Sequence, residues 1–285
     1  MKTKVVLVTG TSSGLGASVA LQAAKRGHKV YATMRDLGKK GDLEAAANKA
    51  KLQLSILALD VQNMASIETA VADVVGREGR IDVVVNNAGT GYARSTEQAP
   101  LEDVSWIMDV NFMGAVRMTK AVIPFMRKAR SGHIINISSV GGLVGQPFNE
   151  IYCASKFALE GYTEALASYV QPHFGVKFTA IEPGGISSEF FNAARKRIAE
   201  TGGLLQDEYL PLLQKYMAKS QERGQVAFQT PDQVAAVVVK CLETKDPPIR
   251  LRTSKWSNDL CRLKTYADPD GKKLQRKVID MFLGR

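Results

Sequence analysis

Lys4-Val5-Val6-Leu7-Val8-Thr9-Gly10-Thr11-Ser12-Ser13-Gly14-Leu15-Gly16 is the segment that says most about how this chain folds. Residues 4–9 are mostly apolar, as is typical of a strand buried on both faces of a parallel sheet. The glycines follow in the spacing Gly-x-x-x-Gly-x-Gly, and a helical pattern covers residues 17–26. A strand–turn–helix unit offers free N–H groups and the positive end of a helix dipole to a phosphate. The segment therefore predicts a dinucleotide-binding turn, with an ordinary tight turn as the alternative.

Strand and helix patterns continue to alternate along the chain. Apolar runs predict strands at residues 29–34, 52–59, 81–85, 132–139, 176–181 and 249–251. Helical patterns lie between them at residues 64–75, 101–129, 149–174 and 231–242. This alternation predicts an α/β fold with a single Rossmann-like, doubly wound parallel sheet. Ligands of such sheets lie beyond the carboxyl ends of the strands, where Gly10, Arg35, Asp60 and residues 86–89 are all expected.

Composition narrows the classes of function. The formal net charge is +10, but basic residues are mixed with acidic ones. A solvated basic face is therefore favoured over a membrane or polyanion surface, and no nucleic-acid partner is predicted. No apolar run approaches the roughly 20 residues of a membrane span, so no integral membrane segment is expected. Three cysteines, far apart in the sequence, predict neither a disulfide framework nor a metal site, and we expect a cytoplasmic protein.

Arg35 indicates which dinucleotide the chain prefers. Met34 stands where an acidic residue would accept a hydrogen bond from the 2′-OH of NAD. Arg35, directly after it, can donate two hydrogen bonds to the 2′-phosphate of NADP. We therefore predict NADP(H) as the cofactor; a plain surface arginine at a strand end is the alternative.

Tyr152 and Lys156 form a candidate acid–base pair. Their i, i+4 spacing places the phenol and the ammonium on one face of a helix. A nearby cation favours the phenolate and lowers the pKa of a tyrosine from its usual value of about 10. The pair can therefore move a proton on or off an alcohol oxygen, whereas the ordinary alternative is an amphipathic surface turn.

Together these motifs resemble the short-chain dehydrogenase/reductase family. The matching pieces occur in order: Thr9-Gly10-x-x-x-Gly14-x-Gly16, Asp60, Asn86-Asn87-Ala88-Gly89, Asn111, Ser139, Tyr152-x-x-x-Lys156 and Pro183-Gly184. The resemblance implies that Tyr152 exchanges the proton of the substrate oxygen, which Ser139 orients. It implies that Lys156 lowers the pKa of Tyr152 and binds the nicotinamide ribose. Asn111 would hold a water in a proton relay behind Lys156.

The resemblance also implies a set of cofactor contacts. Asp60 and Val61 would meet the adenine, and Ile186 and Ser188 the carboxamide. The whole set is Gly10, Ser12, Ser13, Gly14, Leu15, Gly16, Arg35, Asp60, Val61, Asn87, Ala88, Gly89, Tyr152, Lys156, Pro183, Gly184, Ile186 and Ser188.

Residues 30–36 and 140–149 most resemble the 17β-hydroxysteroid dehydrogenase type 1 and retinol dehydrogenase branch, and residues 157–161 continue the likeness. This implies NADP and a small apolar substrate, a steroid-, retinoid- or aryl-ketone-like alcohol or carbonyl. Two departures, a polar Gln146 and a Lys219 where the estrogenic enzymes have a histidine, leave the substrate open. The substrate contacts implied are Ser139, Val144, Gln146, Asn149 and Tyr152.

Residues 1–252 are expected to form the dehydrogenase domain, with residues 189–228 as a lid. Apolar residues in the lid either cover an apolar ligand or pack the lid onto the core. Residues 253–285 form a C-terminal extension packed on the same domain. By analogy with the fold, the helices at 101–129 and 149–174 pair subunits into a homodimer, or further into a tetramer.

The prediction for function is an NADP(H)-dependent oxidoreductase, without a metal, that interconverts an apolar secondary alcohol and a ketone. The alternative is a catalytically idle NADP-binding redox sensor. That alternative predicts the loss of the tyrosine, the lysine or the serine, and all three are present.

Overall fold

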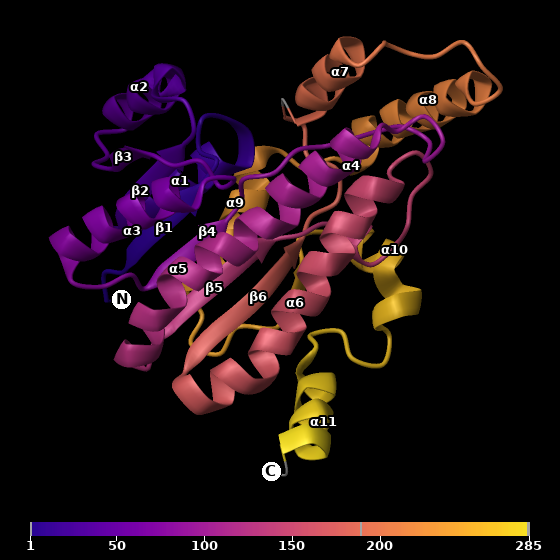
Figure 1. Cartoon of the computed structure of the whole chain (residues 1–285). Helices are drawn as coiled ribbons and strands as arrows, with labels where there is room; N and C mark the ends of the chain where they lie inside the picture. The colour runs from indigo at the N-terminus through magenta and orange to yellow at the C-terminus, as the bar shows by residue number, and fades with distance from the viewer. Residues whose placement is uncertain (1, 189, 284–285) are drawn as a thin grey trace.

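A parallel seven-stranded sheet forms the centre of the computed structural model, which describes residues 2–188 and 190–283 (Figure 1). The strand order is β3-β2-β1-β4-β5-β6-β7, and every neighbouring pair is parallel. The predicted doubly wound α/β fold is confirmed. The strands are β1 (Val5–Thr9), β2 (Lys29–Met34), β3 (Ser55–Ala58), β4 (Val83–Asn86), β5 (Gly132–Ile137), β6 (Val176–Glu182) and β7 (Arg250–Arg252).

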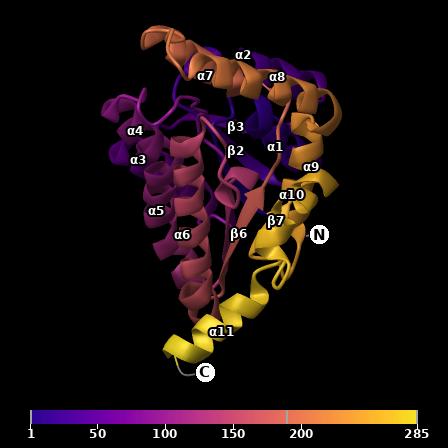
Figure 2. The same ribbon diagram turned by 90° about the vertical axis from the view of Figure 1, so that its right-hand side faces the viewer.

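Helices cover both faces of the sheet, as Figures 1 and 2 show. Val5 and Leu7 of β1 belong to one apolar cluster, with α3 (Met64–Glu78), α5 (Gly114–Ala129) and α6 (Glu150–Phe174). Val6 and Val8 belong to the other, with α1 (Gly14–Lys25), α2 (Gly41–Lys49) and α9 (Pro231–Glu243). Because both faces of β1 are buried, its sequence reads as a continuous apolar run.

The helix predicted at residues 101–129 is interrupted in the structure. It consists of α4 (Leu101–Met108), a π-helical turn (Asp109–Met113) and α5. Asn111 lies in the middle of the π-helical turn. Such turns are frequent at functional sites, because they re-aim the residues within one otherwise regular helix.

The lid is more regular than its sequence suggested. From residue 190 it consists of α7 (Phe190–Glu200) and α8 (Leu210–Ala227), while position 189 lies outside the described residues. Nη2 of Arg94 donates to the carbonyls of residues 198, 201 and 203, which caps the carboxyl end of α7. Arg197 of α7 pairs with the buried carboxylate of Asp103 in α4. These two arginines hold the lid helix against the rest of the domain.

The C-terminal extension forms α10 (Lys255–Thr265) and α11 (Lys272–Leu283); its last two residues lie outside the described part. Gln275 of α11 donates to the carbonyl of Ala167 in α6. Figures 1 and 2 place α11 at the opposite end of the sheet from α7 and α8. Within residues 2–188 and 190–283, none of the helices combines the length and apolarity needed to span a bilayer.

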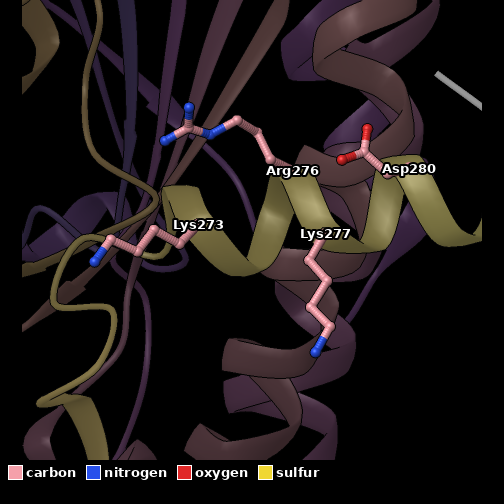
Figure 3. A pocket seen from close by; sticks show the side chains of 4 residues that line it. All are labelled: Lys273, Arg276, Lys277 and Asp280. Atoms are coloured by element: carbon pink, nitrogen blue, oxygen red, sulfur yellow. The ribbon is translucent and has the colours of Figure 1, made fainter.

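The exposed side of α11 carries a basic surface. In Figure 3, Lys273, Arg276, Lys277 and Asp280 line an open hollow on this helix. All four residues are exposed. The arrangement is typical of a solvated basic face, and it lies far from the carboxyl ends of the strands.

Candidate active site

The glycine-rich turn between β1 and α1 is packed directly against the exit of β4. Gly10 and Gly14 have φ angles of 69° and 58°, in the region that favours glycine. A Cβ atom at Gly16 would lie 2.2 Å from the carbonyl oxygen of Gly10. The Thr9 hydroxyl accepts hydrogen bonds from the N–H groups of Asn87 and Ala88, each at 3.0 Å. The spacing of the glycines is therefore required by contacts between backbones.

The first turn of α1 is suited to hold a phosphate. Ser13 stands at the N-cap, and its side chain makes no capping hydrogen bond within the described residues. The first turn carries no acidic residue. Its leading N–H groups and the helix dipole are thus available to an anion, and the glycines leave space for close approach. The residues present fit the diphosphate of a dinucleotide.

Residues expected near the adenosine follow β2 and β3. Met34 is buried and Arg35 is exposed, so the guanidinium can reach a ligand at the strand end. Oδ1 of Asp60 accepts a hydrogen bond from the Gln62 N–H at 3.0 Å. Val61 is 8% exposed and lies next to the π-helical turn, so its main chain rather than its side chain is better placed to meet an adenine.

Tyr152, Ser139 and Lys156 meet beyond the carboxyl end of β5. The Ser139 hydroxyl lies near enough to Tyr152 to act on its pKa, and it accepts from the Gly141 N–H at 3.0 Å. Nζ of Lys156 lies 5.8 Å from the centre of the Tyr152 ring and donates to the carbonyl of Ile137 at 2.8 Å. The two hydroxyls form a pair, and the ammonium is fixed one helical turn away by the end of β5.

Asn111 is fully engaged by its neighbours. Its Oδ1 accepts from the Thr90 N–H at 2.8 Å, and its Nδ2 donates to the Thr90 carbonyl at 3.0 Å and to Ser155 Oγ at 3.1 Å. A Cβ atom at Gly89 would lie 3.2 Å from Asn111 Oδ1 and 3.8 Å from Lys156 Nζ. The side chain therefore fixes the loop after β4 beside Lys156. The proton relay through a water at Asn111 stays a prediction.

The electrostatics of the pair differ from the sequence expectation. Burial raises the pKa of Tyr152 to about 12, against the opposing effect of the Ser139 hydrogen bond. Burial lowers the pKa of Lys156 to about 8, while Glu160 acts in the opposite direction. The expected lowering of the Tyr152 pKa by Lys156 is not found in this arrangement. The reason is that the ammonium is directed to the Ile137 carbonyl and burial penalises the phenolate.

The segment after β6 closes the site from the other side. The side chain of Ser188 lies against Gly14, since a Cβ atom there would be 3.5 Å from Ser188 Cβ. Ile186 forms a β-bridge with Gln229. Pro183 accepts a hydrogen bond from the Val140 N–H at 2.9 Å, and Gly184 packs against the ring of Trp256. This segment thus joins the phosphate turn to the turn that carries Ser139.

Two of the residues expected at the substrate, Tyr152 and Asn149, contact aromatic side chains of the lid. Phe190 packs edge-on to Tyr152, with ring centroids 5.9 Å apart. The Asn149 amide donates to the Tyr216 hydroxyl at 2.7 Å. Gln146 is half-buried near Gly141, 3.4 Å from a Cβ atom placed there. The Val144 carbonyl faces the Cys153 thiol at 3.9 Å.

Phe190 and Tyr216 belong to the apolar residues expected in the lid, but the sequence did not indicate which site residue each of them contacts. Lys219, which stands where the estrogenic enzymes have a histidine, is exposed and pairs with Glu222 at 2.8 Å. Its ammonium is therefore directed to another lid residue of α8.

A family model decides the relationship. The model described as short chain dehydrogenase matches residues 4–199. The chain is a short-chain dehydrogenase/reductase. This confirms the resemblance inferred from the sequence and places the protein among oxidoreductases that act on CH–OH groups and bind a nicotinamide cofactor.

Individual relatives of this short-chain dehydrogenase/reductase agree with the predicted branch. It is 40% identical to retinol dehydrogenase 8 of Bos taurus, over 94% of this chain and 86% of that protein. It is 38% identical to 17-beta-hydroxysteroid dehydrogenase type 1 of Homo sapiens, over 95% and 83%. It is also 39% identical to a 3-ketodihydrosphingosine reductase of Bacteroides thetaiotaomicron, over 88% of each.

Proposed function

We propose that this protein is an NADP(H)-dependent oxidoreductase that interconverts an apolar secondary alcohol and a ketone, with Tyr152 as the acid and base. The observation that carries the proposal is the Ser139–Tyr152 hydroxyl pair, with Lys156 one helical turn away, beside the glycine-rich turn. A test is a panel of steroids, retinoids, aryl ketones and long-chain ketones, followed by the absorbance of NADPH. Turnover of none of them, in either direction, would count against the proposal.

The protein's own residues position the reactants and handle the proton. The nicotinamide, when bound, supplies or accepts the hydride. Ser139 donates a hydrogen bond to the substrate oxygen and orients it towards Tyr152. In reduction Tyr152 gives its proton to that oxygen as negative charge develops there; in oxidation the phenolate takes it back. Lys156, which the Ile137 carbonyl holds one helical turn away, would bind the ribose of the nicotinamide.

An apolar substrate is supported by the lid and by the relatives. Phe190 of the lid packs on Tyr152, and Tyr216 of the lid packs on Phe148, just before α6, so the lid brings aromatic rings to the acid–base pair and to the segment beside it. The relatives' names specify retinol, a 17β-hydroxysteroid and 3-ketodihydrosphingosine, each largely hydrocarbon with one reacting oxygen. Burial of such a ligand gains about 25 cal/mol per Å² of apolar surface.

Arg35 provides a test of the cofactor. Arg35→Asp removes the guanidinium that would bind the 2′-phosphate and puts a negative charge in its place. A charge-assisted hydrogen bond contributes about 1.5–3 kcal/mol, so we expect the preference for NADPH over NADH to fall by about 100-fold. The measurement is the ratio of kcat/KM for the two cofactors. Arg276→Asp on α11, far from the site, is the control; if Arg35→Asp leaves the ratio as unchanged as the control does, Arg35 does not bind the phosphate.

The raised pKa of Tyr152 predicts which direction of the reaction, reduction or oxidation, has a rate that depends on pH. Oxidation of an alcohol releases one proton, so the ratio of the two kcat/KM values changes tenfold per pH unit in any enzyme. With a free-enzyme pKa of about 12, the phenol stays protonated through neutral pH. Between pH 6 and 8 we expect kcat/KM for reduction to be flat and kcat/KM for oxidation to rise about tenfold per unit. A reduction rate that falls already between pH 6 and 7, below the pKa of about 8 of Lys156, would show that the pKa of Tyr152 is low.

A homodimer is supported by apolar side chains on the helices expected to pair subunits. Phe125 and Met113 lie on or beside α5, Phe157 and Tyr169 on α6, and all are 39–47% exposed. A second copy that packs on these helices would cover them. Sedimentation velocity of the full chain at micromolar concentration measures the state, and a concentration-independent monomer would exclude the dimer.

A further inference from the structure

Two buried carboxyl groups lie directly behind the catalytic residues. Tyr152, Lys156 and Glu160 follow one another at i, i+4 spacing on one face of α6. Glu160 is 5% exposed, and Glu182, at the end of β6, is 0% exposed. The helix and the strand lie side by side in Figures 1 and 2, and the two carboxyls are close enough to hydrogen-bond. Neither residue belongs to the acid–base pair.

The turn that carries Ser139 rests on this carboxyl pair. A Cβ atom at Gly142 would lie 2.8 Å from Ser138 Oγ and 3.1 Å from Glu160 Oε1. The Ser138 N–H donates to the carbonyl of Ile181 at 2.8 Å, which ties the turn to the residue before Glu182. Glu160 is therefore packed beneath residues 138–142.

Four oxygen atoms here lack partners if both carboxyls are ionised. They are Oε1 and Oε2 of Glu160, Oε1 of Glu182 and Oγ of Ser138, counted among the residues that the structure describes. Burial raises the pKa of Glu182 to about 7, against the opposing effect of Arg252 and Arg250. Because Oε2 of Glu182 accepts from Arg252 at 2.8 Å, Glu182 is the member of the pair that ionises first. A single proton on Glu160, donated to Glu182 Oε1, pairs two of the four oxygens. The Ser138 hydroxyl faces Glu160 across Gly142 and acts to lower the pKa of that carboxyl, so a small movement of either side chain would pair the remaining two oxygens.

The charges around the pair balance only if it holds one proton. With Glu160 neutral, three cations face three carboxylates; with both carboxyls ionised, one buried negative charge is uncompensated, which is costly. Burial raises the pKa of Glu160 well above its ordinary value, and the nearby Glu182 acts in the same direction. Cys261 of α10 also faces the pair, and burial raises the pKa of its thiol to about 11, so it stays neutral. The three cations counted here are Lys156, Arg250 and Arg252, and the three carboxylates are Glu164, Glu182 and Asp268.

We propose that Glu160 and Glu182 form a carboxylic acid–carboxylate pair that shares one proton and positions the turn bearing Ser139. Glu160 is a positioning residue: it acts on the substrate oxygen only through Ser138 and the turn. The pair also ties this turn to the C-terminal extension, because Arg252 donates both to Glu182 and to the carbonyl of Pro269, at 2.8 and 2.6 Å.

The first test counts the shared proton and uses no turnover. A carboxyl that stays protonated in the folded state but ionises on unfolding makes the protein less stable as pH rises above its unfolded pKa of about 4.5. Chemical unfolding between pH 5 and 7 measures this loss. In the wild type, release of this one proton lowers the folding equilibrium constant about tenfold for each pH unit. We expect Glu160→Gln, which keeps a donor for Glu182, to lack this contribution, so that its stability falls less steeply with pH. Glu68→Gln, at an exposed position on α3, should leave the wild-type slope unchanged.

The outcome that overturns the shared proton is equal pH slopes for wild type and Glu160→Gln. A spectroscopic measurement on the wild type covers the case in which the variant does not fold. Infrared spectra of protein labelled with ¹³C-glutamate at pH 7 should show the carbonyl stretch of a buried protonated carboxylic acid. Absence of that band would also exclude the pair.

The second test concerns positioning and rests on the proposed function. Glu160→Leu leaves Glu182 Oε1 and Ser138 Oγ without a partner, so we expect kcat to fall at least tenfold, with the Kd of NADPH unchanged. Glu160→Gln should restore most of the loss. A Glu160→Leu protein as active as wild type would overturn the positioning role. If wild type has no activity, the proposed function fails, and the proton count still decides the pair.

Discussion

Tyr152→Phe is expected to abolish turnover, by about 10²–10⁴-fold in kcat, while NADPH binds as before. The change removes only the oxygen that exchanges a proton with the substrate. The ring that packs against Phe190 remains. Because Lys156 donates to the Ile137 carbonyl and not to the phenol, its position does not depend on the lost hydroxyl. The measurements are steady-state kinetics in both directions and NADPH affinity by fluorescence titration.

Tyr169→Phe is the matched control, since Tyr169 lies on the same helix and is 47% exposed. It removes a hydroxyl from α6 without touching the site, and both kcat and affinity should stay near wild type. A Tyr152→Phe protein that keeps more than a tenth of wild-type kcat would show that another group transfers the proton. Loss of NADPH binding in the same variant would show instead that the hydroxyl is a cofactor contact.

Features set by local spacing were predictable from the sequence. The glycines at 10, 14 and 16 predict the turn because each is required by a backbone conformation or a backbone contact. Tyr152 and Lys156 fall on one helix face because four residues make about one turn. The parallel sheet follows from the alternation of apolar runs with helices, since parallel neighbours require crossovers.

Features that depend on distant partners were not predictable. The pKa of Tyr152 rises because the phenol is buried, and Lys156 does not offset this because its ammonium donates to the main-chain carbonyl of Ile137. The pattern of side chains in a sequence does not indicate where a backbone carbonyl lies in the fold. The π-helical turn at Asn111 is likewise set by the Thr90 backbone, which lies 21 residues earlier and uses both ends of the amide.

The buried carboxyl pair shows the same limit. From the sequence alone, Glu160 looks like an ordinary glutamate on a helix, and Glu182 looks like a polar residue at the end of a strand. Their contact depends on how α6 packs along β6, and their charge depends on Arg252 from a third element. The pair therefore depends on the packing of α6, β6 and β7, which the sequence does not specify.

Gly16→Ala is expected to cost both stability and cofactor binding. The added Cβ atom would lie 2.2 Å from the Gly10 carbonyl oxygen and 2.9 Å from its carbon, so the phosphate turn must move. Overpacking of this kind typically costs about 1–3 kcal/mol of stability. A displaced turn also loses N–H hydrogen bonds to phosphate, at about 1.5–3 kcal/mol each, and we expect NADPH affinity to fall by about 100-fold.

Gly76→Ala tests whether the effect comes from the contact or from the helix. Gly76 also lies within a helix, α3, but a Cβ atom there meets nothing within 4 Å. Replacing a helical glycine by alanine should therefore stabilise the protein by up to about 1 kcal/mol and leave NADPH affinity unchanged. The measurements are chemical unfolding and NADPH titration of both variants. Wild-type affinity in a folded Gly16→Ala protein would mean that the cofactor's phosphates do not lie on the turn before α1, and the proposed site would have to be placed elsewhere.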